Sequence, residues 1–227
     1  MRYNELTFQG RNAVLEAFRS GKTIDKLFIL DGCQDGPIKS IVREAKKTDA
    51  IINYVDKERL DRLAGTGRHQ GVVAIGAAYE YAEVDDILAS AKEKGEDPFI
   101  FILDEIEDPH NLGAIIRTAN LAGAHGVIIP KRRAVGLTAT VAKTSAGAIN
   151  YTPVAKVTNI SQTIEELKKQ GLWFVCADMG GETMYNLNLK GPIGLVIGNE
   201  GNGVSRLVKD KCCLLYTSPS PRDRSLS

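Results

Sequence analysis

One stretch of the chain, a short apolar run followed by a polar loop, a helix and a second apolar run, constrains the fold most. The first run, 98–103, is β-branched and aromatic, as buried strands are. Asp108 is a preferred N-cap, and the helix that it opens ends at Gly123. A second buried strand is predicted at 126–130. Because ligands of open α/β sheets bind beyond the carboxyl ends of the strands, this order predicts a site in the loop after residue 103.

Two further apolar runs, at 172–177 and 193–197, have the same character. A helix capped by Asn159 or Ser161 precedes the first of them. Repeated alternation of strand and helix predicts a mostly parallel sheet. We therefore predict an α/β domain over residues 98–213.

The N-terminal part of the chain predicts a second, smaller α/β domain over residues 1–78. Its amphipathic helix at 10–18 and its apolar strands alternate as in a sheet flanked by helices. Residues 79–97 are charged and of low complexity, and we interpret them as an interdomain linker that contains one short helix.

Composition excludes several classes of protein. The chain has 227 residues, 43% of them hydrophobic and 25% charged, with a formal net charge of +1, so a basic surface would have to be a local patch. No run approaches the ~18 apolar residues of a membrane span, and the N-terminus lacks the apolar core of a signal peptide, so we expect a cytoplasmic protein. The four cysteines and three histidines show neither zinc spacing nor a Ser-His-Asp order, so no metal is expected.

Two motifs resemble the signatures of a known family. The stretch NLGAIIRTA at 111–119 resembles the first signature of the SpoU/TrmH methyltransferases, and LVIGNEGNGVS at 195–205 resembles the second. These enzymes belong to the knotted SPOUT class and methylate ribose 2′-hydroxyls of RNA with S-adenosylmethionine as cofactor. The resemblance extends from Asn4 to Cys213 and is greatest to the RlmB-type enzymes that act on a guanosine of 23S rRNA. It implies an α/β-knot domain and a homodimer.

The resemblance also implies roles for individual residues. Catalytic roles fall to Asn111, Arg117 and Glu200. Cofactor contacts fall to Ala177, Gly198, Asn199, Gly201 and Gly203. Because a guanidinium with a pKa above ~12 is a poor proton acceptor, we assign Arg117 to electrostatic stabilisation and orientation of the reacting hydroxyl. Glu200 is expected to hold Arg117 or Asn111 in place.

The residues of the glycine-rich loop at 198–203 support a cationic ligand independently of the resemblance. The loop lacks both G-x-G-x-x-G and G-K-[ST], and it carries the carboxylate of Glu200 but no lysine. A phosphate would be repelled, so the partner is either a sulfonium or Arg117. Ser205 is interpreted as a helix cap.

RNA contacts are expected in two places. Residues 1–78 resemble the ribosomal-protein-L30-like substrate-binding domain of the family, on the matching stretches at 10–14 and 69–74. The candidates are Arg11, Asn12, Arg68, His69 and Gln70, with a helix cap (Asn12) and a strand entry (His69, Gln70) as the alternative. Lys131, Arg132 and Arg133 follow the strand at 126–130 as a possible phosphate clamp, or as a solvated loop.

The last residues, 214–227, depart from the family pattern. They are rich in Ser, Pro and Arg, and the third signature expected here is absent. We interpret this tail as an appended or frame-shifted translation, which leaves the methyltransferase domain truncated before the knot is completed. Two alternatives therefore stay open: a non-catalytic RNA-binding module, and a methyltransferase of tRNA or of an antibiotic-resistance site in rRNA.

Overall fold

The computed structural model describes residues 6–48, 50–65 and 67–217, which form two compact units. The first unit runs to Glu80 and includes Gly136–Ala142; the second comprises Tyr81–Val135 and the chain from Lys143 onward. The α/β class and the two-part organisation are as predicted. Among the described residues, no helix is long and apolar enough to cross a membrane.

The first unit is a four-stranded mixed sheet with helices on both faces. Its elements are β1(Leu6–Gln9), α1(Arg11–Arg19), β2(Ile24–Leu30), α2(Gly36–Lys47), β3(Ile51–Val55), α3(Lys57–Ala64) and β4(Val72–Gly76), and the strand order is β1-β4-β2-β3. Neighbouring residues of a strand point to opposite faces. In β2, Leu27 and Ile29 therefore pack with α1 and α2, whereas Phe28 packs with Leu60 of α3.

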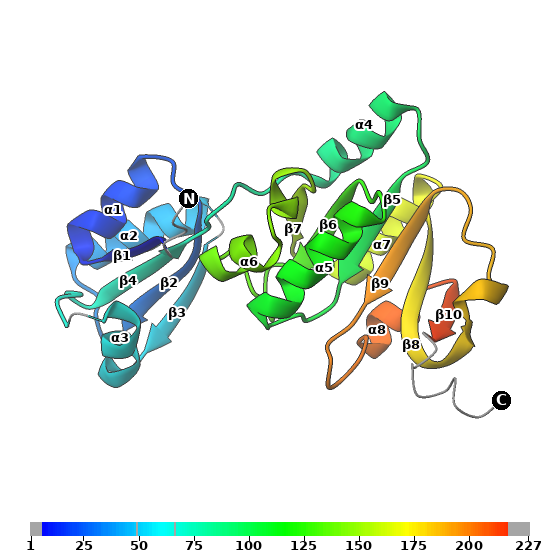
Figure 1. Cartoon of the computed structure of the whole chain (residues 1–227). Coiled ribbons are helices and arrows are strands. Elements are labelled where there is room, and N and C mark those ends of the chain that lie inside the picture. Colours follow the sequence, from blue (N-terminus) through cyan, green and yellow to red (C-terminus); the bar gives the residue numbers. More distant parts are fainter. Residues whose placement is uncertain (1–5, 49, 66, 218–227) are drawn as a thin grey trace. The chain divides into compact units, whose positions relative to one another are not determined.

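The second unit is built on a six-stranded, all-parallel sheet (Figure 1). Its elements are α4(Val84–Lys94), β5(Phe99–Leu103), α5(Pro109–Leu121), β6(Gly126–Pro130), β7(Val154–Val157), α7(Ile160–Lys169), β8(Trp173–Thr183), β9(Ile193–Ile197), α8(Arg206–Lys209) and β10(Leu214–Thr217). Helix α6(Ala139–Thr144) spans the division, because Gly136–Ala142 belong to the first unit. Two 3-10 turns lie at Ala148–Asn150 and Met184–Asn186. The strand order is β10-β8-β9-β5-β6-β7, so β9, late in the chain, lies beside β5.

Helices cover both faces of this sheet. On one face, Ile102, Phe174 and Val196 form a core with α4, α7 and α8. On the other face, the buried side of α5 carries Leu112 and Ile116. The tight fit on the first face shows at Gly126, where a Cβ would lie 2.6 Å from Cδ1 of Ile87.

Two expectations from the sequence are corrected. The predicted linker at 79–97 is largely α4, whose Ile87 and Ala91 are fully buried in the core of the second unit. Because the exposed side of α4 is charged, its composition alone did not indicate these buried contacts. Residues 214–217, assigned to an appended tail outside the fold, form strand β10 and pair in parallel with β8. Residues 218–227 of that tail lie outside the described residues.

Candidate active site

Strands β9 and β5 end side by side next to Ala177 of β8, and this register brings the two sequence motifs together. Ala177 of β8 pairs with Ile197 of β9, and Ile197 pairs with Leu103 of β5. The loop after β5 and the glycine-rich loop after β9 therefore start at the same edge of the sheet. The Asp104 amide extends this pairing, because it donates to the carbonyl of Ile197 at 2.8 Å.

The loop at 198–205 closes on itself. The amide of Asn199 donates to the Gly203 carbonyl at 3.0 Å, and the amide of Gly203 donates back to the Asn199 carbonyl at 2.8 Å. Gly203 has φ 67°, a left-handed conformation that favours glycine. At Gly198 a Cβ would lie 2.1 Å from the carbonyl carbon of Gly203, so no side chain fits there. These two glycines are needed for the shape of the loop itself.

Asn199, predicted to contact a cofactor, uses its side chain within the protein. Its Nδ2 donates to the carbonyl of Glu105 at 3.0 Å, and its Oδ1 accepts from the amides of Gly201 at 2.8 Å and Asn202 at 3.3 Å. The Asn199 side chain therefore organises the loop and ties it to the loop after β5. Gly201 and Asn202 are exposed at its tip.

The side chains of Asn111 and Glu200 are in contact, which is one of the two pairings expected for Glu200. Asn111 lies in the first turn of α5, which Asp108 caps by accepting from the amide of His110 at 2.8 Å. The Asn111 Nδ2 donates to Oε2 of Glu200 at 3.2 Å. A side chain of the first motif thus contacts a side chain of the second across 89 positions of sequence.

Arg117 does not join this pair. It lies six residues after Asn111 on α5, so at ~100° per residue the two side chains are about 120° apart around the helix. Arg117 is exposed and makes no hydrogen bond or ion pair with the part of the chain that the structure describes. Within one chain its guanidinium is therefore free for an external ligand, and the alternative that Glu200 holds Arg117 is not realised.

Gly113 of the first motif has a packing role that the sequence did not reveal. A Cβ there would lie 1.9 Å from Oγ1 of Thr144, and that hydroxyl donates to the carbonyl of Pro109 at 3.2 Å. The segment at 144–145 therefore lies directly against the first turns of α5, which fixes the helix that carries Asn111.

Two aspartates near the loop were also missed by sequence reasoning. Asp104, only 5% exposed, accepts from the amide of Ser205 at 2.7 Å. Asp178, just after Ala177 in β8, forms an ion pair with Lys209 of α8, and this partner raises the pKa of Lys209 above its ordinary value. The only available signal was their position at the carboxyl ends of apolar strands.

The basic run at 131–133 is not a set of three free cations. Arg133 has φ 55° and forms an ion pair with Glu105 at 2.9 Å, and the hydrogen bond that it donates to Glu105 raises the Arg133 pKa. Arg132 is exposed, whereas Lys131 is half-buried. A clamp of three cations is therefore reduced to Arg132, with Arg133 bound to a carboxylate.

In the first unit, Arg11 and Gln70 form one cluster. The Arg11 amide donates to Oε1 of Gln70 at 3.2 Å, and its Nε donates to the Gln70 carbonyl at 3.1 Å. Its Nη2 reaches Asp35 at 2.5 Å. Asn12 and Arg68 are exposed, so these two candidates remain open to RNA. Asn12 is not the cap of α1, since Gly10 occupies that position.

His69 is corrected from an RNA contact to a structural residue. It is 6% exposed, its Nε2 lies 2.8 Å from Oδ1 of Asp61, and its Nδ1 accepts from the amide of Gly71 at 3.0 Å. An Nδ1 that accepts leaves the proton on Nε2, which donates to Asp61. Both ring nitrogens are therefore engaged inside the first unit.

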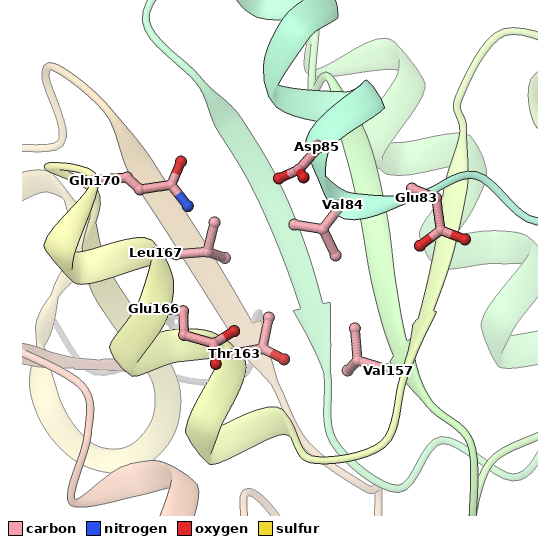
Figure 2. Close-up of a pocket in the computed structure, with 8 residues that line it drawn as sticks. All are labelled: Glu83, Val84, Asp85, Val157, Thr163, Glu166, Leu167 and Gln170. Carbon is pink, nitrogen blue, oxygen red and sulfur yellow. The ribbon is translucent and has the colours of Figure 1, made fainter.

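A cavity elsewhere in the second unit lies apart from the predicted site residues and lacks the cations that would bind RNA. It measures about 240 Å³ and lies among α4, β7 and α7 (Figure 2). Its polar lining includes the carboxylates of Glu83, Asp85 and Glu166 and no lysine or arginine, and none of the predicted site residues borders it. Among the described residues, no group of three or more His, Cys, Asp or Glu side chains is placed to hold a metal ion.

Both parts of the chain match known protein families. Residues 98–226 match the SpoU rRNA Methylase family, and residues 9–82 match the domain described as RNA 2'-O ribose methyltransferase substrate binding. The match extends past Cys213, where the resemblance was expected to end. The chain is 52% identical over 211 residues to the putative TrmH family tRNA/rRNA methyltransferase YacO of Bacillus subtilis, covering 92% of this chain and 84% of the relative. A Staphylococcus haemolyticus relative of the same description is 49% identical over 209 residues, again covering 92% and 84%.

Solved structures show the same fold. The SpoU methyltransferase AviRb from Streptomyces viridochromogenes, in complex with the cofactor AdoMet, has a TM-score of 0.57 at 20% identity and covers 95% of this chain and 81% of its own. An rRNA methyltransferase from Sinorhizobium meliloti has a TM-score of 0.56 at 23% identity, covering 96% and 80%. The fold is that of a SPOUT methyltransferase with an N-terminal substrate-binding domain. This chain belongs to the SpoU/TrmH family of RNA methyltransferases.

Proposed function

We propose that this protein transfers a methyl group from S-adenosylmethionine to a ribose 2′-hydroxyl of RNA, with a guanosine of 23S rRNA as the target. The observation that carries the proposal is the contact of the two family motifs at one edge of the sheet, through Asn111 and Glu200. The substrate-binding match over residues 9–82 supports the ribose hydroxyl as acceptor. We further propose that the enzyme is cytoplasmic and, as the family resemblance implies, a homodimer.

The loop at 198–205 fits S-adenosylmethionine better than it fits a phosphate ligand. Its only charged side chain, Glu200, is exposed and negative, which suits the cationic cofactor. Gly198 leaves no room for a side chain, and Gly201 and Asn202 present backbone at the exposed tip. When bound, the cofactor supplies an electrophilic methyl group. The loop chemistry supports this assignment, together with the AdoMet complexes of two distantly related methyltransferases.

In this mechanism the protein positions the hydroxyl and stabilises its developing negative charge. Asn111, fixed by Glu200, is placed to orient the ribose. Arg117, exposed and unpaired within the described chain, is the cation that meets the acceptor oxygen or an adjacent phosphate. Arg68 and Asn12 of the first unit contact RNA outside the reacting nucleotide.

The test is methylation of defined RNAs by the purified 227-residue protein. We expect 2′-O-methylguanosine in a 23S rRNA transcript and none in tRNA, read by mass spectrometry of nuclease digests. Methylation of tRNA alone would replace the substrate assignment. If S-adenosylmethionine binds but no methylation occurs, only the cofactor part of the proposal is supported. RNA binding without cofactor binding would favour a non-catalytic RNA-binding module.

Arg117→Ala tests the proposed role of the cation. We expect kcat to fall by about 100-fold or more, as when a transition-state donor is removed, with an unchanged melting temperature because the side chain is exposed. Lys169→Ala, an exposed cation in the last turn of α7, is the matched control and should keep full activity. Near-normal turnover by Arg117→Ala would remove Arg117 from the mechanism.

A further inference from the structure

The segment at 104–105 holds the glycine-rich loop at both of its ends. At the entrance, the Asp104 amide donates to the carbonyl of Ile197, and the Glu105 carbonyl accepts from Nδ2 of Asn199. At the exit, the Asp104 carboxylate accepts from the amide of Ser205 at 2.7 Å. Each of the two side-chain contacts joins residues more than ninety positions apart in sequence.

The exit contact differs from the others because it depends on one buried side chain. Asp104 is 5% exposed, and a carboxylate in such a place is costly unless donors satisfy it. A hydrogen bond from a backbone amide to a carboxylate is charge-assisted, shorter and stronger than one between neutral groups. The position of Ser205 is therefore set by a strong contact with a buried carboxylate.

The exit of the loop determines where its tip lies. Ser205 is followed directly by α8 and preceded by Val204, which is buried in the core. Glu200, at the tip, must reach Asn111 on α5, and Asp104 lies in the same loop that leads into α5. One carboxylate thus sets the position of the second motif relative to the first.

We infer that Asp104 is a positioning residue for methyl transfer: its carboxylate, through the amide of Ser205, holds the loop at 198–205 in place for S-adenosylmethionine and holds Glu200 within reach of Asn111. The inference rests on the proposed function. It assigns Asp104 no contact with the reacting atoms. Its effect is exerted through the loop, so it concerns cofactor affinity first and turnover second.

Three variants separate this role from ordinary stabilisation. Asp104→Ala removes the acceptor, and Asp104→Asn keeps an acceptor oxygen of the same size. Ser205→Pro removes the donor from the other side, and the φ of −59° at Ser205 suits proline. Asn159→Ala is the matched control, because Asn159 likewise accepts from a backbone amide, that of Gln162 at 3.1 Å, at the start of α7.

We expect Asp104→Ala and Ser205→Pro to weaken S-adenosylmethionine binding by about 10-fold or more, measured by calorimetry, as displacement of a positioned group does. Hydrogen exchange of the amides at 199–205 should accelerate in the same two variants. Asp104→Asn should keep binding within about 3-fold of the unaltered protein. Asn159→Ala should lower the melting temperature yet leave cofactor affinity and exchange of this loop unchanged.

The outcomes distinguish this inference from the proposed function. If the unaltered protein does not bind S-adenosylmethionine, the proposed function fails, and exchange at 199–205 still decides whether Asp104 holds the loop. If it binds and both Asp104→Ala and Ser205→Pro bind equally well with unchanged exchange, the positioning role is overturned. Loss of affinity by Asp104→Asn as large as that by Asp104→Ala would also overturn it, since the acceptor would then not be what matters. Should Asp104→Ala fail to fold, Ser205→Pro and Asp104→Asn carry the same test.

Discussion

The turn at 68–71 in the first unit and the loop at 198–205 in the second are built alike and charged oppositely. Both contain backbone at positive φ, at Gln70 and Gly203, and both are fixed by side chains that bond to backbone amides. The turn displays the cation of Arg68, whereas the loop displays the carboxylate of Glu200. Similar local construction therefore presents one surface suited to a polyanion and another suited to a cation.

The two regions also differ in how closely the backbone approaches itself. A Cβ at Gly71 would lie 3.1 Å from the Sγ of Cys33, a side-chain atom, while a Cβ at Gly198 would meet backbone at 2.1 Å. The contact at Gly71 can be relieved by moving a side chain, and what favours glycine there is its φ of 81°. The contact at Gly198 cannot be relieved in this way, because the atoms it meets are the main chain of Gly203 and Val204. The largest effects of substitution are therefore expected in the loop.

Gly198→Ala should have the largest effect. The added methyl group must displace the backbone at Gly203 and Val204, at a cost of about 1–3 kcal/mol in the free energy of unfolding, and S-adenosylmethionine affinity should fall about 100-fold. Gly36→Ala is the control, because a Cβ at Gly36, in α2 of the first unit, would have no atom within 4 Å. Equal affinities of the two variants would show that the close approach at Gly198 is unimportant for the site.

Asn111→Asp should have the next largest effect. It replaces the amide donor by a carboxylate that faces Glu200, so the two charges repel and the motifs separate. We expect kcat/KM to fall by about 10- to 100-fold, measured by initial rates on the RNA substrate. His110→Ala, an exposed neighbour in the same turn, should change little. Full activity of Asn111→Asp would contradict a role for the pair.

In the turn of the first unit, we expect His69→Ala to affect stability and Arg68→Ala to affect RNA binding. His69→Ala leaves the amide of Gly71 without its acceptor and should lower the free energy of unfolding by about 2 kcal/mol. Arg68→Ala should leave stability within about 0.5 kcal/mol but weaken RNA binding and reduce its salt dependence by about one counterion. Denaturant titration and binding at several salt concentrations measure both quantities. Weaker RNA binding by His69→Ala together with lower stability of Arg68→Ala would contradict this prediction.

The smallest effect is expected at an ion pair away from both regions. Lys211 donates a hydrogen bond to Glu165 and lowers the pKa of that carboxyl below its ordinary value. Because the folded-state pKa is the lower one, the pair adds stability above the ordinary glutamate range and loses it as the pH falls through the lowered value. In Lys211→Ala the pKa of Glu165, followed by NMR titration, should rise toward its ordinary value. An unchanged pKa would show that the pair does not persist in solution.

The sequence by itself determined the strands and helices around the site and the order of the two motifs. The apolar runs at 98–103, 126–130 and 193–197 became β5, β6 and β9 because their residues can be buried on both faces of a parallel sheet. The cap at Asp108 followed from local chemistry, since an N-cap acts on amides two or three residues away. Such features depend on neighbours in sequence, so they can be predicted without a fold.

Only the tertiary structure decided which polar side chains are free. His69 was buried against Asp61, Arg133 was paired with Glu105, and Asn199 was committed to the loop, while Arg117 remained exposed. The same holds for α4. Only its packing against β6 in the tertiary structure shows which of its residues are buried. These outcomes depend on contacts between residues far apart in sequence, and the order of strands, which places β9 beside β5, is what creates those contacts.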